Sequence, residues 1–165
     1  FEAETRPTTG SSIFSKDFQV GLDTIKLNMW DTAGQERFHA LNNIYYANAA
    51  AIVVVYAADD NSSQNIMTHI NAVRDHVPNC VLFLACNKID LNADNQAANI
   101  EAGKKIASEM DIPFFEVSAK NGANVDDLSQ AIALQLHSPH SMNYVQETGI
   151  DVNNSTNENN TTCNC

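Results

Sequence analysis

The sequence predicts an α/β fold in which helices cover both faces of a mostly parallel sheet. Residues 50–56 and 81–86 are short runs of β-branched and other apolar residues without alternation, which is typical of strands buried on both faces. Residues 114–117 are predicted to form a third, shorter strand of the same type. Segments with helical spacing of apolar residues lie between these runs, and such alternation of buried strands with amphipathic helices favours parallel pairing. The chain has 165 residues, enough for one domain of ordinary size.

Two strands are expected before the first buried run. Residues 13–20 and 24–30 are rich in strand-forming residues, and the segment 21–23 (GLD) provides a tight connection between them. Apolar and polar side chains alternate along residues 24–30. The apolar positions are Ile25, Leu27 and Met29. The pattern predicts a hairpin with one buried face.

Three segments carry apolar residues at helical spacing. The apolar positions are Ile66, Ile70, Val73 and Val77 in the first segment, Ile100, Gly103, Ala107 and Met110 in the second, and Val125, Leu128, Ile132 and Leu136 in the third. The first segment follows polar residues that favour a helix start, and Pro78 comes directly after it. Asp126 and Asp127 lie in the first turn of the third, where the helix dipole favours negative charge.

The charge and the apolar runs exclude several classes of protein. Lys and Arg number 9 against 20 Asp and Glu, so the net charge is −11. A chain this acidic is not expected to bind nucleic acid, whose phosphates need a basic surface. The longest apolar run, residues 49–58, is half of the ~20 residues that a transmembrane helix needs. The four cysteines do not suggest a disulfide framework, which fits a reducing cytosolic setting.

Composition divides the chain into two regions. Residues 1–136 have the periodic patterns of a globular α/β domain, whereas residues 137–165 are polar and rich in Asn. Because such a segment cannot bury enough apolar surface to offset its ordering entropy, residues 137–165 are expected to form a disordered tail.

Side chains with distinctive chemistry follow the predicted strands, where ligands of parallel α/β sheets bind. Asp31 ends one strand, and a carboxylate there can hold Mg²⁺, which prefers oxygen ligands. Gly34 would let a backbone N–H approach a phosphate closely because it has no Cβ. An Asp-x-x-Gly sequence is also common in simple turns, so this signal is weak by itself.

The next two strand ends have features that suit a guanine base. Asp90, in the sequence NKID at 87–90, could accept the two N–H groups that guanine offers from one edge, and the stem of Lys88 could lie along a purine face. Backbone N–H groups of the sequence SAK at 118–120 could meet a carbonyl oxygen such as guanine O6. Each of these two motifs also has a simpler interpretation. Asn and Asp after a strand often cap the following helix, and SAK can form an ordinary turn.

The conjunction of these motifs, in order and each at a strand end, resembles the Rab group of the Ras superfamily of small GTPases. The motifs are WDTAGQERF at 30–38, NKID at 87–90 and SAK at 118–120, and the Tyr pair at 45–46 and the terminal Cys-x-Cys support them. The resemblance covers residues 1–136. The stretches TTGSSIF at 8–14 and YYANAAAIVVVY at 45–56 are most similar to the early-endosome branch of that group.

The resemblance implies a P-loop NTPase-type domain whose N-terminal part is missing. The motif GxxxxGKS/T, whose backbone N–H groups cradle phosphates, is absent. The first strand, the phosphate loop and the first helix are therefore expected to be absent. Loss of that strand, which is central in the family, should expose the edges of its two neighbours.

The resemblance also implies the role of each site residue, with GTP as substrate and Mg²⁺ as cofactor. Thr8 and Asp31 would hold Mg²⁺; Thr8 and Gly34 would contact the γ-phosphate; Gln35 would position the attacking water; Asn87, Lys88, Asp90, Ser118, Ala119 and Lys120 would bind guanine; Ile13, Trp30 and Tyr45 would form the effector surface; and Cys163 and Cys165 would carry geranylgeranyl groups. Ile13 stands where the family usually has Phe, which makes that surface smaller.

The implied function is a GTP-binding and GTP-hydrolysing switch in vesicle and endosomal traffic. Its expected partners are GTP and GDP, an exchange factor, a GTPase-activating protein, a GDP-dissociation inhibitor or escort protein, effectors, and a membrane bound through prenyl groups. It would cycle between the cytosol and the cytoplasmic face of endosomal membranes. The alternative is a truncated, non-enzymatic Rab-like binding module that cannot hold nucleotide.

Overall fold

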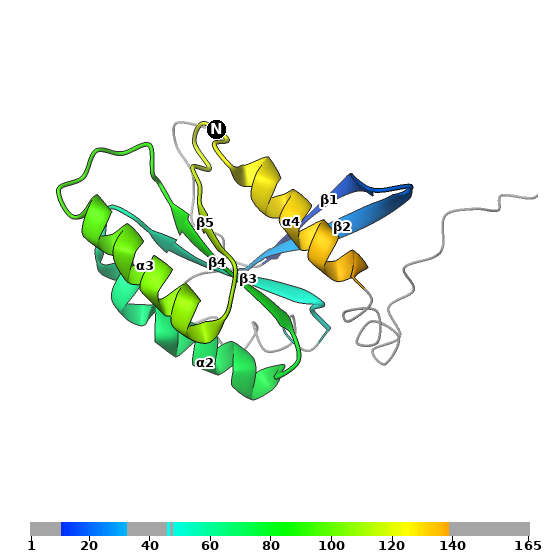
Figure 1. Cartoon of the computed structure of the whole chain (residues 1–165), viewed down its shortest axis with the longest axis horizontal. Coiled ribbons are helices and arrows are strands. Elements are labelled where there is room, and N and C mark those ends of the chain that lie inside the picture. Colours follow the sequence, from blue (N-terminus) through cyan, green and yellow to red (C-terminus); the bar gives the residue numbers. More distant parts are fainter. Residues whose placement is uncertain (1–10, 33–45, 47, 139–165) are drawn as a thin grey trace, which may run out of the picture.

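The computed structural model describes residues 11–32, 46 and 48–138 of the chain. The elements, in order, are β1 (Ser11–Val20), β2 (Asp23–Thr32), β3 (Ala51–Ala57), the short 3₁₀ helix η2 (Asn61–Asn65), α2 (Ile66–His76), β4 (Val81–Asn87), α3 (Gln96–Met110), β5 (Phe114–Glu116) and α4 (Val125–His137) (Figure 1). Among the described residues, no helix is both long and apolar enough to cross a bilayer.

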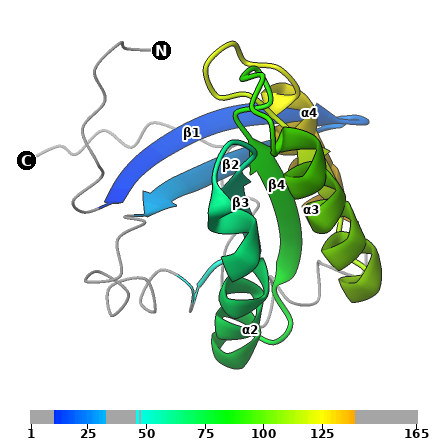
Figure 2. The same ribbon diagram turned by 90° about the vertical axis from the view of Figure 1, so that its left-hand side faces the viewer.

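Strands β3, β4 and β5 form a parallel sheet with β4 in the centre. Ala57 is the register partner of Asn87, and Cys86 is the partner of Glu116, so the carboxyl ends of the three strands lie at one edge. Helices α2 and α3 pack side by side on one face of this sheet, and α4 packs on the other (Figures 1 and 2). This architecture confirms the predicted α/β fold with helices on both faces of a mostly parallel sheet.

Strands β1 and β2 form a separate antiparallel hairpin. Gly21 occupies the connection with φ +63°, a left-handed backbone that glycine adopts without steric cost. Ile25 and Leu27 are buried whereas Lys26 and Asn28 are exposed, which confirms the predicted alternation. Within the described strands, β2 pairs only with β1, and β3 pairs only with β4.

Strand β4 contributes side chains to two hydrophobic cores. Leu82, Leu84 and Cys86 face a core formed with β3, α2 and α3. Phe83 faces the other way, into a core formed with the hairpin and α4. Both sets are buried, as the unbroken apolar run of residues 81–86 predicts for a central parallel strand.

Helix α4 connects the hairpin to the parallel sheet (Figure 1). Its Ile132 and Ala133 pack in one core with hairpin residues and Phe83. Three polar contacts also join α4 to the hairpin. They are Lys16 Nζ to Asp126 Oδ1 at 2.6 Å, Gln130 Nε2 to the Gln19 carbonyl at 2.9 Å, and His137 Nε2 to Asp23 Oδ2 at 3.3 Å. Because these pairs are exposed, the apolar contacts contribute most of the attachment.

The structure departs from the sequence prediction in a few places. The prediction that residues 50–56 are covered on both faces is wrong at Val55, whose side chain is 57% exposed on the face opposite α2 and α3. Helix α3 begins at Gln96, four residues before the first predicted apolar position. Helix α4 includes His137, which composition assigned to the tail. Element ends depend on caps and tertiary contacts, which periodicity does not report.

Replacing Gly103 with alanine should destabilise the fold although alanine is the better helix former. A Cβ at this position of α3 would overlap the hydroxyl of Tyr56 and lie 2.9 Å from Phe114 Cε2. We expect a loss of about 1–3 kcal/mol in the free energy of unfolding, the usual cost of overpacking a core. Thermal or urea unfolding measures it.

The variant Gly103→Ala/Tyr56→Phe is the matched control. Removing the hydroxyl relieves the closest overlap and leaves the contacts with Cζ of residue 56 (2.8 Å) and Phe114 Cε2 (2.9 Å). The second substitution should therefore cost less in the Gly103→Ala background than in the unmodified chain, where it removes the hydrogen bond from Tyr56 Oη to the Asn99 carbonyl (2.9 Å). Equal or greater stability of Gly103→Ala would show that the helix can move away from β3 at no cost.

Candidate functional site

Three loops meet at the carboxyl edge of the parallel sheet. Residues 58–60 follow β3, residues 88–91 follow β4, and residues 117–124 follow β5. Backbone bonds continue the sheet into these loops, from Ala58 N to the Asn87 carbonyl at 2.8 Å and from Val117 N to the Cys86 carbonyl at 2.8 Å. Because β3, β4 and β5 are adjacent and parallel, their loops are brought together as a consequence of the strand order.

Asn87 ties the loop after β4 to the loop after β5. Its Oδ1 accepts a hydrogen bond from the backbone N–H of Lys88 at 2.7 Å and another from the N–H of Ala119 at 3.0 Å. The amide oxygen is therefore used within the protein, while the NH₂ group of the same side chain can donate to a ligand. Helix α3 begins at Gln96, so neither Asn87 nor Asp90 caps it.

Asp90 is an ionised carboxylate held in a fixed position. Its Oδ1 accepts a hydrogen bond from Ser118 Oγ at 2.6 Å, and its Oδ2 lies 3.6 Å from Lys120 Nζ. The hydrogen bond from Ser118, with a smaller contribution from the Lys120 charge, lowers the pKa of this carboxyl. The side chain is 12% exposed, so part of the carboxylate still faces solvent and can accept further N–H donors.

The loop after β5 is stabilised by its own hydrogen bonds. Ser118 is fully buried, its N–H donates to the Ala123 carbonyl at 3.0 Å, and its carbonyl accepts from Gly122 N at 2.9 Å. Gly122 has φ +81°, a conformation that suits glycine. Asn124 Nδ2 donates to the Glu116 carbonyl at 2.7 Å. The hydroxyl that fixes Asp90 thus belongs to a rigid turn.

Lys88 has a left-handed backbone, with φ +67°. Its Nζ donates to both carboxylate oxygens of Asp59, at 3.0 and 3.2 Å. The lysine therefore connects the loop after β4 with the loop after β3, and the three loops form one bonded cluster.

Two residues of this cluster were not predicted from the sequence, Asp59 and Asn99. Asn99 lies on α3, is buried, and donates from Nδ2 to the carbonyls of Ala58 at 2.9 Å and Asp60 at 2.8 Å, while its Oδ1 accepts from Ser63 Oγ at 2.8 Å. A signal for Asn99 existed, because it precedes Gly103 and Ala107 by one and two helical turns and so shares their buried face. No local pattern marks Asp59.

The remaining predicted site residues fall into two groups. Asp31 and Trp30 lie near the end of β2, in the hairpin, and Ile13 is the cross-strand partner of Trp30. These side chains therefore belong to a different sheet from the cluster around Asn87. Thr8, Gly34, Gln35, Tyr45, Cys163 and Cys165 lie outside the described residues.

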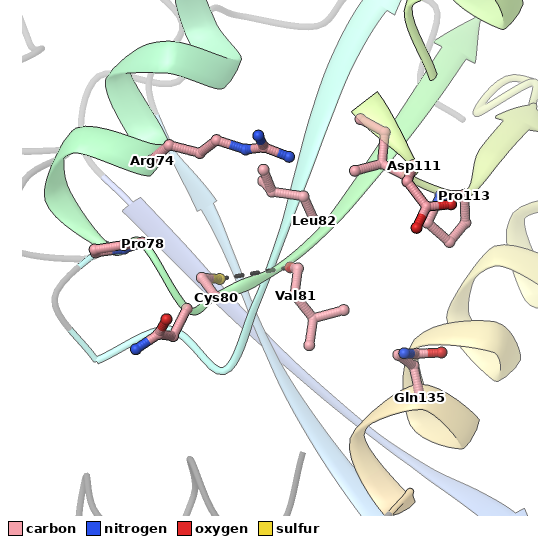
Figure 3. Close-up of a pocket in the computed structure, with 10 residues that line it drawn as sticks. Arg74, Pro78, Cys80, Val81, Leu82, Asp111, Pro113 and Gln135 are labelled. Atoms are coloured by element: carbon pink, nitrogen blue, oxygen red, sulfur yellow. Dashed lines mark hydrogen bonds between the residues drawn. The ribbon is translucent and has the colours of Figure 1, made fainter. Parts of the chain in front are cut away.

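A separate hollow lies at the opposite end of the parallel sheet (Figure 3). It encloses about 400 Å³ near the start of β4 and β5, and Arg74, Cys80, Asp111 and Gln135 are among its lining residues. Burial raises the pKa of the Cys80 thiol to about 12, so this group is protonated and is not a nucleophile at neutral pH. Because its lining residues lie near the amino ends of β4 and β5, the hollow is distinct from the candidate base site.

Comparison with known proteins agrees with the motifs. A family model described as "Ras family" matches residues 1–138. Ras-related protein Rab-31 of Rattus norvegicus is 36% identical over 138 residues, which are 82% of this chain and 70% of that protein. Ras-related protein RIC1 of Oryza sativa subsp. japonica is 43% identical over 112 residues, 67% of this chain and 55% of that protein.

A third relative, Ras-related protein Rab5 of Nicotiana tabacum, is 38% identical over 133 residues, which are 78% of this chain and 65% of that protein. The family model thus spans the whole described fold, and Rab proteins align with most of the chain. The chain belongs to the Ras family of small GTPases and, within it, to the Rab group.

Proposed function

We propose that this protein binds guanine nucleotide at the loops that follow β3, β4 and β5, and that it hydrolyses GTP as a switch in endosomal membrane traffic. The observation that carries the proposal is the ionised Asp90 carboxylate, fixed by Ser118 and Lys120 beside an Asn87 that ties two loops together. A charged acceptor at this point selects a base with two N–H donors on one edge, which describes guanine and excludes adenine.

The other base contacts follow from the groups around Asp90. The NH₂ group of Asn87 can donate to a purine nitrogen, since Asn87 Oδ1 already accepts two bonds. The stem of Lys88 can lie along the purine face. The N–H of Ala119 donates to Asn87 Oδ1, so a contact from this N–H to guanine O6 requires an exchange of partners.

The phosphate side of the site is assigned to residues that precede α2. Asp31, at the end of β2, offers the oxygen donor that Mg²⁺ prefers, and Thr8 would supply a hydroxyl. Bound Mg²⁺ would neutralise phosphate charge. Gly34 would let a backbone N–H reach the terminal phosphate, and Gln35 would orient the attacking water. Intrinsic turnover should be slow, because the Arg that stabilises the transition state would come from a GTPase-activating protein.

Two solvent-exposed side chains of the hairpin support the proposed effector surface. Ile13 and Trp30 are cross-strand partners, with exposed fractions of 55% and 50%, so two large apolar side chains lie side by side in contact with solvent. Tyr45 would complete this surface. A contiguous exposed apolar patch favours a protein partner that binds there.

Membrane attachment is assigned to the terminal cysteines Cys163 and Cys165. Two prenyl groups give stable anchoring where one gives only marginal binding. No Lys or Arg follows Lys120, so the end of the chain has no basic residues to attract anionic lipid, and attachment would depend on the prenyl groups. The protein would then cycle between cytosol and the cytoplasmic face of endosomal membranes with the help of an exchange factor and a GDP-dissociation inhibitor or escort protein.

Replacing Asp90 with asparagine should abolish the preference for guanine. The neutral amide replaces a charged acceptor with a group that also donates, and hydrogen bonds to a charged group are worth about 1.5–3 kcal/mol, which corresponds to a loss of about 10- to 100-fold in GDP affinity. Competition of GTP and ATP against a fluorescent GDP analogue measures the change.

The control for this substitution is Asp94→Asn, which lies between β4 and α3 and is exposed to solvent. It should leave both affinities unchanged. A guanine preference that persists in Asp90→Asn would show that another group reads the base. Failure of the unsubstituted protein to bind any guanine nucleotide would favour the non-enzymatic binding module instead.

Replacing Gln35 with leucine should slow GTP hydrolysis while GTP binding is retained. Leucine has a similar size but cannot orient water, so we expect single-turnover hydrolysis to fall by about 10-fold or more. Phosphate release from preloaded protein measures the rate, and the dissociation rate of fluorescent GTP checks binding. Turnover equal to that of the unsubstituted protein would contradict the role given to Gln35.

A further inference from the structure

The contact between Lys88 and Asp59 joins the proposed base site to the end of β3. Lys88 Nζ lies 3.0 and 3.2 Å from the two carboxylate oxygens of Asp59, and the two side chains are 46% and 27% exposed. Asp59 lies two residues beyond the end of β3, and Lys88 one residue beyond the end of β4. The pair therefore bridges the ends of two adjacent parallel strands.

The loop that carries Asp59 is held from behind by α3. Asn99 donates to the carbonyls on either side of Asp59, those of Ala58 and Asp60, and accepts from Ser63 Oγ. The backbone carbonyl of Asn99 accepts from Tyr56 Oη at 2.9 Å. With both neighbouring carbonyls fixed by one buried amide, the backbone at Asp59 has little freedom to move.

The two adjacent carboxylates of this loop, Asp59 and Asp60, have different partners. Asp60 accepts a hydrogen bond from Ser62 N at 2.7 Å. Hydrogen bonding by Ser62, first through its side chain and then through its backbone N–H, lowers the pKa of the Asp60 carboxyl, with a smaller contribution from the Lys88 charge. Asp60 thus caps η2, and its neighbour Asp59 is the one that reaches Lys88.

The main chain and the side chain of Lys88 are held by different contacts. A left-handed conformation at a residue with a Cβ costs about 1–2 kcal/mol and persists where surrounding contacts determine it. The N–H of Lys88 donates to Asn87 Oδ1 at 2.7 Å, and its carbonyl accepts from Leu91 N at 3.1 Å. These bonds fix the main chain, and the contact with Asp59 restrains the direction of the side chain.

We propose that Asp59 is a positioning residue for the base site: its carboxylate, held in place by Asn99, directs the Lys88 side chain so that the lysine stem forms one wall of the purine site. This inference rests on the proposed function, because the site it serves is the guanine site. Asp59 acts through Lys88 and is not itself a contact of the base.

The first test measures the ion pair without nucleotide. Lysine acetylation by an N-hydroxysuccinimide ester, read by mass spectrometry, should modify Lys88 about 2- to 5-fold faster in Asp59→Asn than in the unsubstituted full chain, since a partly exposed ion pair restrains its lysine by about that factor. Lys105 serves as the internal reference. The control Asp75→Asn, on the exposed side of α2, should leave Lys88 reactivity unchanged.

The second test is a double-mutant cycle on guanine-nucleotide affinity. Asp59→Asn should weaken binding of a fluorescent GDP analogue about 2- to 5-fold with an unchanged thermal midpoint, because partly exposed pairs add little to stability. In a Lys88→Ala background the same substitution should cause no further loss, since the lysine it positions is gone.

These tests distinguish a failure of the positioning role of Asp59 from a failure of guanine binding. Three results would overturn the positioning role while guanine binding itself stands. They are equal Lys88 reactivity in Asp59→Asn and the unsubstituted chain, unchanged GDP affinity in Asp59→Asn, and an equally large loss of GDP affinity when Asp59→Asn is made in the Lys88→Ala background. If the unsubstituted chain binds no guanine nucleotide, the proposed function fails and the role at the base fails with it.

Discussion

Burial of β4 between two hydrophobic cores is the constraint on which the rest of the structure depends. Leu82 and Leu84 pack toward α2 and α3, while Phe83 packs toward α4 and the hairpin. A strand in this position must pair on both edges, since unpaired backbone groups there would be buried without partners. Its neighbours β3 and β5 are therefore fixed in parallel register, and their carboxyl ends meet at one edge.

That edge explains why the candidate site consists of loop residues on a rigid support. Asn87 is the last residue of β4, so any shift of the strand would move it relative to Ala119 and Lys88, the two donors that it binds. Ser118 is fully buried and fixes Asp90 from the next loop. The polar groups of the site are thus pre-organised by hydrogen bonds within the protein, which lowers the ordering cost of binding a ligand.

The hairpin is attached to the sheet in a different way. It shares no strand pairing with β3, β4 or β5 and is held by the packing of α4, by Phe83 and by a few exposed polar pairs. Non-directional apolar packing tolerates small displacements that a backbone ladder does not. Among the residues that the structure describes, the hairpin that carries Ile13 and Trp30 is therefore joined to the parallel sheet through side-chain contacts.

The sequence alone determined the fold class, the order of the elements, the buried face of the hairpin and the family, because hydrophobic periodicity and short motifs are local properties. Motif spacing also identified Asn87, Asp90 and Ser118, which the structure brings into one cluster. Only the tertiary structure revealed the contacts of Asp59 and Asn99, since their partners lie 29 and 41 residues away in the chain. It also decided the exposure of Val55. Contacts of this kind depend on which elements pack together, and no local pattern encodes that.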